Sequence, residues 1–316
     1  MDLKELGEFG LIRRIAEGIG VPAGVTGIGD DCAVLPQRDG RVTLVSTDML
    51  MDGVHFILDE ASPCELGWKS AAVNLSDVAA MGGKPVGTFL AFALPPGLGS
   101  AWVDAFMRGY KEISAACGAP LLGGDTTGSK DRLCVCVTVL GECAAGAEVL
   151  RSGARPGDLV CVTGPLGDAA AGLQVVLGGL PRGADEAALV ARHYRPRPRV
   201  AEGQALAAAG ATAMMDISDG IGSDLRHLLE ASGVGARIRV ADLPVSAELR
   251  RCAGKYGWDV EKLAIDGGED YELLFTMPPA AEAGLDVPHT VIGEITDGRK
   301  PEWAGSRADH AGYHHF

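Results

Sequence analysis

A carboxylate stands in the middle of an apolar helical segment, NLSDVAAMGG (residues 74–83), at Asp77. Burying an unpaired carboxylate costs several kcal/mol of folding free energy, and an aspartate contributes nothing to a helix interior. A metal ion bound to the carboxylate would remove this cost. Asn74, one turn earlier on the same helix face, could hold that carboxylate or contact a ligand, and a plain polar stripe is the alternative.

Other aspartates stand where apolar runs meet turn-forming residues, so we expect them to end strands and to converge on one crevice. They are Asp30 and Asp31 in GIGDD, Asp48 in VSTD, Asp125 in GGDTTG, and Asp216 and Asp219 in MDISDG. Hydroxyl groups accompany them at Ser46, Thr47, Thr126 and Ser218. Hard divalent cations such as Mg²⁺ bind carboxylate, hydroxyl and water oxygens, and they share carboxylates with substrate phosphates. Singly, each aspartate is better explained as a turn former or helix cap. Together they favour a metal-binding crevice.

Familiar phosphate-binding and catalytic motifs are absent from the sequence. GIGDD and GGDTTG offer backbone N–H groups to phosphates, but neither is the P-loop pattern. There is no H-R-D kinase loop and no G-x-S-x-G elbow. Among seven histidines, His55 in DGVHF is the one placed to meet a ligand beside Asp48, and a structural histidine is the alternative. The pattern indicates metal-assisted phosphate chemistry without an evident general base.

The elements expected to position these residues alternate between helices and strands. In the first half we expect helices at 7–18, 63–81 and 101–117 and strands at 42–48, 85–94 and 132–142. In the second half we expect strands at 158–164, 211–220, 236–240, 271–277 and 289–296, and helices at 168–179, 200–210 and 223–233. The basic segment RSGARPGD, rich in Gly and Pro, indicates a joint between the halves. We therefore predict an α/β (α+β) chain with two domains, residues 1–150 and 151–316.

Composition narrows the class of protein further. The 316-residue chain is 47% hydrophobic and carries a net charge of −14. This charge argues against a nucleic-acid or anionic-membrane surface, because such surfaces use Lys and Arg to neutralise phosphates. A protein with this charge that handles phosphate must bind cations as well. No apolar run is long enough to span a membrane, so we expect a soluble, cytoplasmic protein. The eight cysteines form no C-x-x-C pair and are predicted to be reduced thiols.

Seven segments occur in a characteristic order: GIGDDCAVL, VSTDMLMDGVHF, KSAAVNLSDVAAMG, LLGGDTT, RSGARPGD, DISDGIGSDL and GGEDYELLF. With this series the chain closely resembles the thiamine-monophosphate kinases, from GEFGLI to the terminal GYHHF. That family shares the two-domain ATP-binding fold of aminoimidazole ribonucleotide synthetase. The resemblance implies ATP-dependent phosphorylation of thiamine monophosphate to thiamine diphosphate, several Mg²⁺ ions, and a homodimer whose N-terminal domains pack through their sheets.

The resemblance also implies roles for individual residues. Metal ligands match Asp31, Ser46, Thr47, Asp48, Asp77, Asp125, Asp216 and Asp219. Nucleotide contacts match Gly124, Asp125, Arg151 and Ser218, and contacts to thiamine monophosphate match His55, Glu269 and Tyr313. One further nucleotide contact of the family, near the second N-terminal helix, has no counterpart that the sequence identifies.

Three alternatives to this function follow from the same features. A selenophosphate synthetase would carry a reactive cysteine or selenocysteine near a lysine in residues 18–31, which contain neither. A hydrogenase maturation factor would end in a cysteine, whereas this chain ends in GYHHF. A non-catalytic metal-dependent binding module is the third alternative, and the presence of both Asp77 and the DISD segment argues against it.

Overall fold

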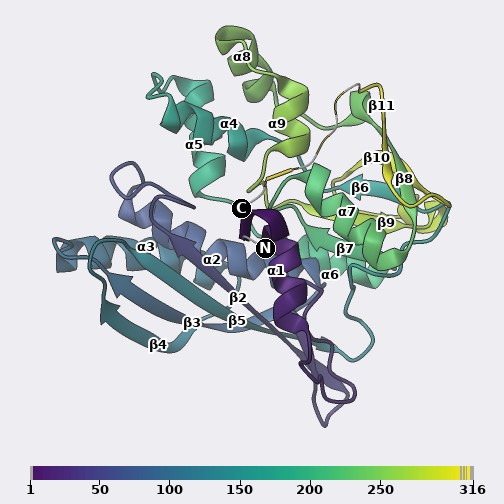
Figure 1. Ribbon diagram of the computed structural model, residues 1–316, viewed down its shortest axis with the longest axis horizontal. Helices are drawn as coiled ribbons and strands as arrows, with labels where there is room; N and C mark the ends of the chain where they lie inside the picture. Colours follow the sequence, from purple (N-terminus) through teal and green to yellow (C-terminus); the bar gives the residue numbers. More distant parts are fainter. Residues whose placement is uncertain (1–2, 307, 309, 311, 314–316) are drawn as a thin grey trace.

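The computed structural model describes residues 3–306 together with 308, 310, 312 and 313. Within this part of the chain, two β-sheets follow one another in sequence, one of five strands and one of six (Figure 1). The prediction of a mixed α/β chain is confirmed. The boundary that we place between residues 150 and 151 stays a prediction.

The first sheet has the strand order β1-β2-β5-β3-β4 and is antiparallel except for the β3–β4 pair. Its strands are β1 (Ala33–Pro36), β2 (Arg41–Met51), β3 (Lys84–Leu94), β4 (Leu121–Gly128) and β5 (Cys134–Ala144). Helices α2 (Pro63–Ala80) and α3 (Ser100–Ala116) cover one face of this sheet (Figure 1). The side chains of Met49 and Phe89 lie on the opposite face and are exposed.

The second sheet has the order β11-β8-β10-β6-β9-β7. Its strands are β6 (Leu159–Val162), β7 (Ala213–Asp216), β8 (Gly235–Arg239), β9 (Leu273–Met277), β10 (Thr290–Thr296) and β11 (Pro301–Ala304). The remaining helices are α1 (Leu3–Ala16), α4 (Asp168–Leu177), α5 (Ala184–Tyr194), α6 (Val200–Ala209), α7 (Ile221–Ser232), η1 (Val240–Asp242), α8 (Ala247–Tyr256), α9 (Val260–Asp266) and α10 (Pro279–Glu282). None of the described helices combines the length and apolarity needed to cross a bilayer.

Helix α2 begins and ends at residues suited to those positions. The Ser62 hydroxyl accepts a hydrogen bond from the backbone N–H of Glu65 at 3.2 Å, and Pro63 fits the first turn, where no backbone donor is needed. The helix is followed by Gly82, whose φ of 68° favours glycine. Small residues along α2 allow most of it to be buried, and its buried residues include the charged Lys69.

Glycines let α2 approach neighbouring helices from both halves of the chain. A Cβ atom on Gly67 would lie 1.9 Å from the carbonyl oxygen of Phe106 in α3. A Cβ atom on Gly203 in α6 would lie 2.1 Å from the carbonyl oxygen of Ala79. Backbones this close leave no room for a side chain. Helix α2 is therefore packed directly against the second half of the molecule.

Two strand predictions were wrong. The segment containing GGDTTG, predicted as a turn after a strand, is itself the edge strand β4, in which Asp125 pairs with Ala91 of β3. Asp48 does not end its strand either, because β2 pairs with β5 as far as Met51. Backbone pairing with a neighbouring strand decided both cases, and sequence patterns do not show such pairing. Helices α5, α8 and α9 were not predicted.

Candidate active site

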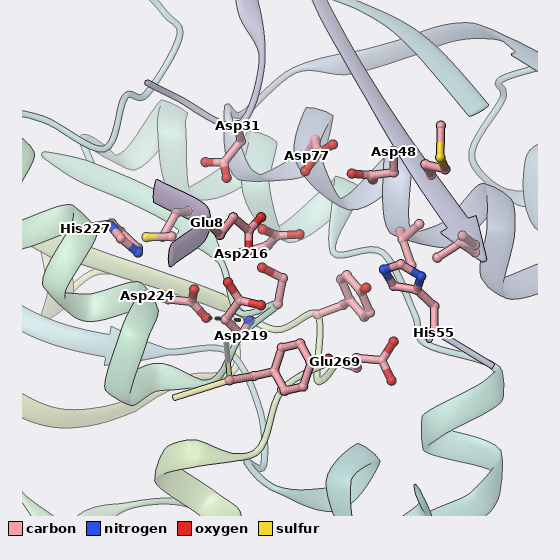
Figure 2. Close-up of a pocket in the computed structure, with 18 of the residues that line it drawn as sticks. Glu8, Asp31, Asp48, His55, Asp77, Asp216, Asp219, Asp224, His227 and Glu269 are labelled. Carbon is pink, nitrogen blue, oxygen red and sulfur yellow. Dashed lines mark hydrogen bonds between the residues drawn. The ribbon is translucent and has the colours of Figure 1, made fainter. Parts of the chain in front are cut away.

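A cavity of about 910 Å³ lies between the two halves of the chain, and its walls come from both (Figure 2). β2 and α2 contribute from the first half, and the end of β7 and the loop after α9 contribute from the second. The volume falls within the range of sites that enclose nucleotide-sized ligands.

Three buried or half-buried carboxylates converge in this cavity. Asp31 precedes β1, Asp77 lies on α2 and Asp216 ends β7. One oxygen of each lies within 4.8 Å of the others. Asp48 of β2 points into the same region (Figure 2). The local sequence explains each placement, because a buried helix, a strand face and a strand end all present their side chains to one crevice.

The electrostatics of the cluster show how crowded these charges are. Burial and the charge of Asp31 raise the pKa of Asp48 to about 6 and the pKa of Asp216 to about 8. Burial, Asp48 and Asp216 raise the pKa of Asp77 well above its ordinary value. A group of carboxylates with such pKa values is unfavourable as a set of bare anions. Bound cations would stabilise its ionised form.

The donor set fits a hard divalent cation. Oδ2 of Asp31 is buried and accepts no hydrogen bond from any described residue. Ser46 donates to Oδ2 of Asp77 at 2.6 Å, which orients that carboxylate. Arg151 neutralises part of the charge through an Nη2–Oδ1 contact of 2.7 Å to Asp31. Carboxylate and hydroxyl oxygens are the ligands that Mg²⁺ prefers.

Asn74 connects β2, which carries Asp48, to α2, which carries Asp77. Its side-chain carbonyl accepts a hydrogen bond from the backbone N–H of Asp48 at 3.1 Å, and its amide donates to the carbonyl of Ser70 at 3.1 Å. The side chain of Asn74 thus ties β2 to α2, a role that we did not predict. Both of these hydrogen bonds join Asn74 to backbone groups and not to the Asp77 carboxylate.

The residues matched to the organic part of the substrate also line this cavity. His55 and Glu269 lie on one side of the view in Figure 2, away from His227. The ring Nδ1 of His55 accepts a hydrogen bond from the backbone N–H of Met51 at 3.1 Å. Tyr313 also lines the cavity, and its backbone N–H donates to the carbonyl of Asp219 at 2.9 Å. The final three residues of GYHHF lie outside the described residues.

Most of the residues predicted for the site line this single cavity. They are Asp31, Ser46, Asp48, His55, Asp77, Arg151, Asp216, Ser218, Asp219, Glu269 and Tyr313. Thr47, Gly124 and Asp125 do not line it. Thr47 points to the opposite face of β2, where its hydroxyl donates to the carbonyl of Val137 at 3.1 Å. Side chains alternate along a strand, so Thr47 cannot share the direction of its neighbours Ser46 and Asp48.

Several cavity residues were not predicted. Glu8 of α1 and His227 of α7 line the cavity, as does Asp224, which accepts a hydrogen bond from the backbone N–H of Asp219 at 3.2 Å (Figure 2). Burial and the charge of Asp219 raise the pKa of Asp224. Lys69 of α2, which contacts Glu269, was also missed. The cost of burying a charge singles out Lys69 as it does Asp77, because both lie on the same largely buried helix.

Comparison with known proteins places both halves of the chain in one family. Residues 29–143 match the model of the AIR synthase related protein, N-terminal domain. Residues 155–304 match the model of the AIR synthase related protein, C-terminal domain. The two matches follow the two sheets of the structure.

Relatives that match along almost their whole length identify the family more closely. The thiamine-monophosphate kinase of Salmonella typhimurium is 41% identical over 301 residues, which cover 92% of this chain and 90% of the relative. That of Mycobacterium tuberculosis is 38% identical over 322 residues, which cover 99% and 93%. The solved structure of AaThiL complexed with AMPPCP and TMP is 38% identical, with a TM-score of 0.93 over 100% of this chain and 99% of that one. Two matched domains in order, together with relatives at this identity and coverage, establish that the chain belongs to the thiamine-monophosphate kinase family.

Proposed function

We propose that this protein uses ATP and Mg²⁺ to phosphorylate thiamine monophosphate to thiamine diphosphate, by direct in-line transfer. The observation that carries the proposal is one cavity with two chemically distinct ends. The Asp31, Asp77 and Asp216 carboxylates form one end. Glu269 lies apart from them at the other end (Figure 2), and Tyr313 lines the same cavity. A phosphate ester with a cationic organic group matches this arrangement. Metal ions on the carboxylate cluster would bind its phosphate, and Glu269 would face its cationic group.

At the carboxylate end, Asp31, Asp48, Asp77 and Asp216 would hold Mg²⁺, with Ser46 and Asp219 as further ligands. Bound there, Mg²⁺ would neutralise phosphate charge and act as a Lewis acid. Arg151 offers a fork of donors to nucleotide phosphate oxygens, and Ser218 contributes a hydroxyl. Although burial alone would lower the pKa of Arg151, the nearby Asp31 raises it, so the guanidinium keeps its charge.

At the organic end, the carboxylate of Glu269 and the ring of Tyr313 would contact the cationic, flat rings of thiamine monophosphate. This orientation directs the substrate phosphate toward the carboxylate cluster. A phosphate oxygen then attacks the γ-phosphorus of ATP, and ADP leaves on the opposite side. The attacking oxygen is already ionised near neutral pH, so the reaction requires positioning and charge neutralisation more than a general base.

We further propose that two copies of the chain pack through the exposed face of the first sheet. Exposed apolar side chains of this sheet include Met49, Val86, Phe89 and Leu122. Thr47 and Asp125 lie on the exposed part of the same sheet. Their proposed contacts to metal and nucleotide, and those of Gly124, therefore depend on the assembled homodimer. An exposed apolar face of this kind is typical of a protein interface.

An assay of ADP release, with chromatography of the thiamine products, tests the proposed reaction. We expect ADP and thiamine diphosphate in equal amounts, only when ATP, Mg²⁺ and thiamine monophosphate are all present. Thiamine, which lacks the attacking phosphate, is the matched control and should release no ADP. Incubation with γ-labelled ATP alone should leave the protein unlabelled, because none of the described side chains that line the cavity is an activated nucleophile. A labelled phosphoenzyme would contradict direct transfer.

A further inference from the structure

Lys69 is a fully buried lysine whose charge is paired inside the molecule. It lies on α2, and its side chain has no exposed surface. Its Nζ lies 2.7 Å from Oε1 of Glu269 and 3.4 Å from the carbonyl oxygen of His55. The ring of Tyr194 lies 5.9 Å from the same nitrogen. A buried ammonium is tolerated only when it is paired, so the surroundings of Lys69 are specific to its charge.

The carboxylate that Lys69 contacts lies in a strained loop. Glu269 has a φ of 68° and Tyr271 a φ of 50°, values that non-glycine residues rarely adopt. Such a conformation persists only where the surrounding structure holds it in place. The contacts of Lys69 to the Glu269 side chain supply part of that restraint, and they come from the other half of the chain.

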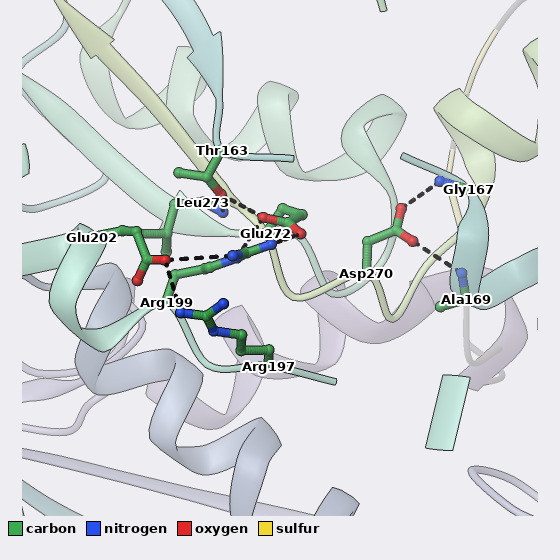
Figure 3. Close-up of polar contacts among 9 residues, drawn as sticks. All are labelled: Thr163, Gly167, Ala169, Arg197, Arg199, Glu202, Asp270, Glu272 and Leu273. Carbon is green, nitrogen blue, oxygen red and sulfur yellow. Dashed lines mark hydrogen bonds and ion pairs between the residues drawn. The ribbon is translucent and has the colours of Figure 1, made fainter. Parts of the chain in front are cut away.

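Two neighbouring acidic residues, Asp270 and Glu272, anchor the same loop to other segments of the second half (Figure 3). Asp270 accepts hydrogen bonds from the backbone N–H groups of Gly167 at 2.6 Å and Ala169 at 3.1 Å. Glu272 accepts from the hydroxyl of Thr163 at 2.6 Å and from Nε of Arg199 at 2.7 Å. Asp270 and Glu272 point away from the cavity toward these anchors. This leaves Glu269 as the acidic residue of the loop that faces the cavity.

The charge state of Glu269 follows from its neighbours. Although burial alone would raise its pKa, Lys69 and His193 lower the pKa of Glu269 to about 2. Burial and the charge of Lys69 lower the pKa of His193, while the neighbouring Glu269 opposes this effect. Nδ1 of His193 lies 3.1 Å from Oε2 of Glu269, without the alignment of a hydrogen bond. Among its neighbours, the charge of Lys69 lowers the pKa of Glu269 most.

Helix α2 connects this contact to the carboxylate cluster. Lys69, Val73 and Asp77 recur at intervals of four residues, which places them along one helix face. Asp77 lies eight positions after Lys69 on the helix, a rise of about 12 Å. Val73 and Asp77 line the cavity, and Lys69 contacts the cavity residue Glu269. One rigid helix thus sets the spacing between the two ends of the site.

We propose that Lys69 is a positioning residue that holds the Glu269 carboxylate in place and ionised for the cationic group of thiamine monophosphate, at a distance from the metal-binding carboxylates set by α2. The inference rests on the proposed function. It predicts that Lys69 acts on binding of thiamine monophosphate through Glu269, while binding of ATP is independent of it.

The test compares Lys69→Met with Glu269→Gln and with the double variant. We expect Lys69→Met to raise the KM for thiamine monophosphate about tenfold, because a charge-assisted contact that orients Glu269 is lost. The KM for ATP should change less than about twofold. The KM of the double variant for thiamine monophosphate should be no higher than the higher of the two single-variant values. The effects of residues that act as a unit are not additive. If Lys69→Met does not fold, the double variant, which buries no unpaired charge, supplies the measurement against Glu269→Gln.

A pH profile separates positioning from a merely structural role. The titratable groups that face Glu269 are Lys69 of α2, His193 and Tyr194 of α5, and Tyr271 of its own loop. Without Lys69, burial raises the pKa of Glu269 toward the assay range. The ratio of the variant KM to the parent KM should therefore fall as pH rises from about 5.5 to about 8.5. Taking the ratio cancels the titration of the substrate phosphate.

Lys255→Met is the matched control. Lys255 contacts the carboxylate of Glu186 at 2.6 Å, outside the cavity, so its loss should leave both KM values unchanged. Equal increases in both KM values for Lys69→Met, or a lower melting temperature with unchanged KM values, would overturn the inference while leaving the proposed function intact. Calorimetric titration of the parent with thiamine monophosphate distinguishes the remaining outcome. If the parent neither binds nor phosphorylates this compound, the proposed function fails and the inference fails with it.

Discussion

Burial and three neighbouring carboxylates raise the pKa of Asp77, which lies in the middle of helix α2. If Asp77 is a metal ligand, Asp77→Asn should lower kcat by about a thousandfold at saturating Mg²⁺, because a cation that clamps the phosphates loses a ligand. Its melting temperature without ligands should rise, because one of the crowded charges is removed. Steady-state kinetics and calorimetry of the metal-free protein measure the two effects.

Asp168→Asn provides the matched control for Asp77→Asn. Asp168 is also a buried aspartate whose pKa burial raises, but it lies outside the cavity, where it accepts a hydrogen bond from Ser246 at 2.5 Å. Its substitution should leave kcat nearly unchanged. Parent-like turnover by Asp77→Asn at ordinary Mg²⁺ would refute the metal interpretation of α2.

Tyr313 tests recognition of the organic group. Its backbone N–H bonds to Asp219, and Gly312 donates to the carboxylate of Asp266 at 3.1 Å, so the segment is held without the Tyr313 ring. Tyr313→Ala should raise the KM for thiamine monophosphate about fivefold, consistent with loss of a stacking or cation–π contact, and should leave the KM for ATP unchanged. Tyr313→Trp should retain activity, because an aromatic face is sufficient. Kinetics with each substrate varied in turn measure the difference, and equal changes in both KM values would assign Tyr313 a structural role only.

At the scale of elements, the position of α2 depends on its contact with α6. Gly203→Ala would place a methyl group 2.1 Å from the carbonyl oxygen of Ala79. We expect a loss of about 1–3 kcal/mol in the free energy of unfolding, because the helices must separate. Since α2 carries Asp77, kcat should fall as well. Urea unfolding and kinetics on the same preparation measure both effects.

Gly254→Ala is the control for this helix substitution. Gly254 lies in α8, and a Cβ atom there would meet nothing within 4 Å. Alanine is the better helix former, so Gly254→Ala should raise the free energy of unfolding by up to about 1 kcal/mol and leave kcat unchanged. A Gly203→Ala variant as stable and as active as the parent would show that α2 and α6 need not lie so close.

At the scale of the whole molecule, the exposed face of the first sheet should hold two copies together. Phe89→Glu should convert the protein to a monomer, because a charge at the centre of an apolar interface is not paired when buried. Activity should fall with it if Thr47 and Asp125 act only in the dimer. Sedimentation velocity measures the assembly, and Ile19→Glu, at an exposed apolar residue outside the strands of this sheet, is the control. A parent protein that sediments as a monomer would contradict the proposed interface.

Much of the fold and part of the site could be predicted from local sequence properties. The apolar, alanine-rich run with its N-cap at Ser62 predicted α2, and the cost of burying a carboxylate identified Asp77. Both arguments need only neighbouring residues, because helix periodicity, capping and desolvation act over a few positions. The ordered motifs similarly indicated the family that the comparisons show.

The tertiary structure decided what depends on distant partners. Pairing with β3 made a strand of the segment that contains Asp125, and strand alternation turned Thr47 away from the cavity. The contact between Lys69 and Glu269 joins residues 200 positions apart, through a loop whose φ values no sequence pattern indicates. Which strand pairs with which, and which buried charge meets which, are properties of the packed chain, because they arise only when the two halves enclose one cavity.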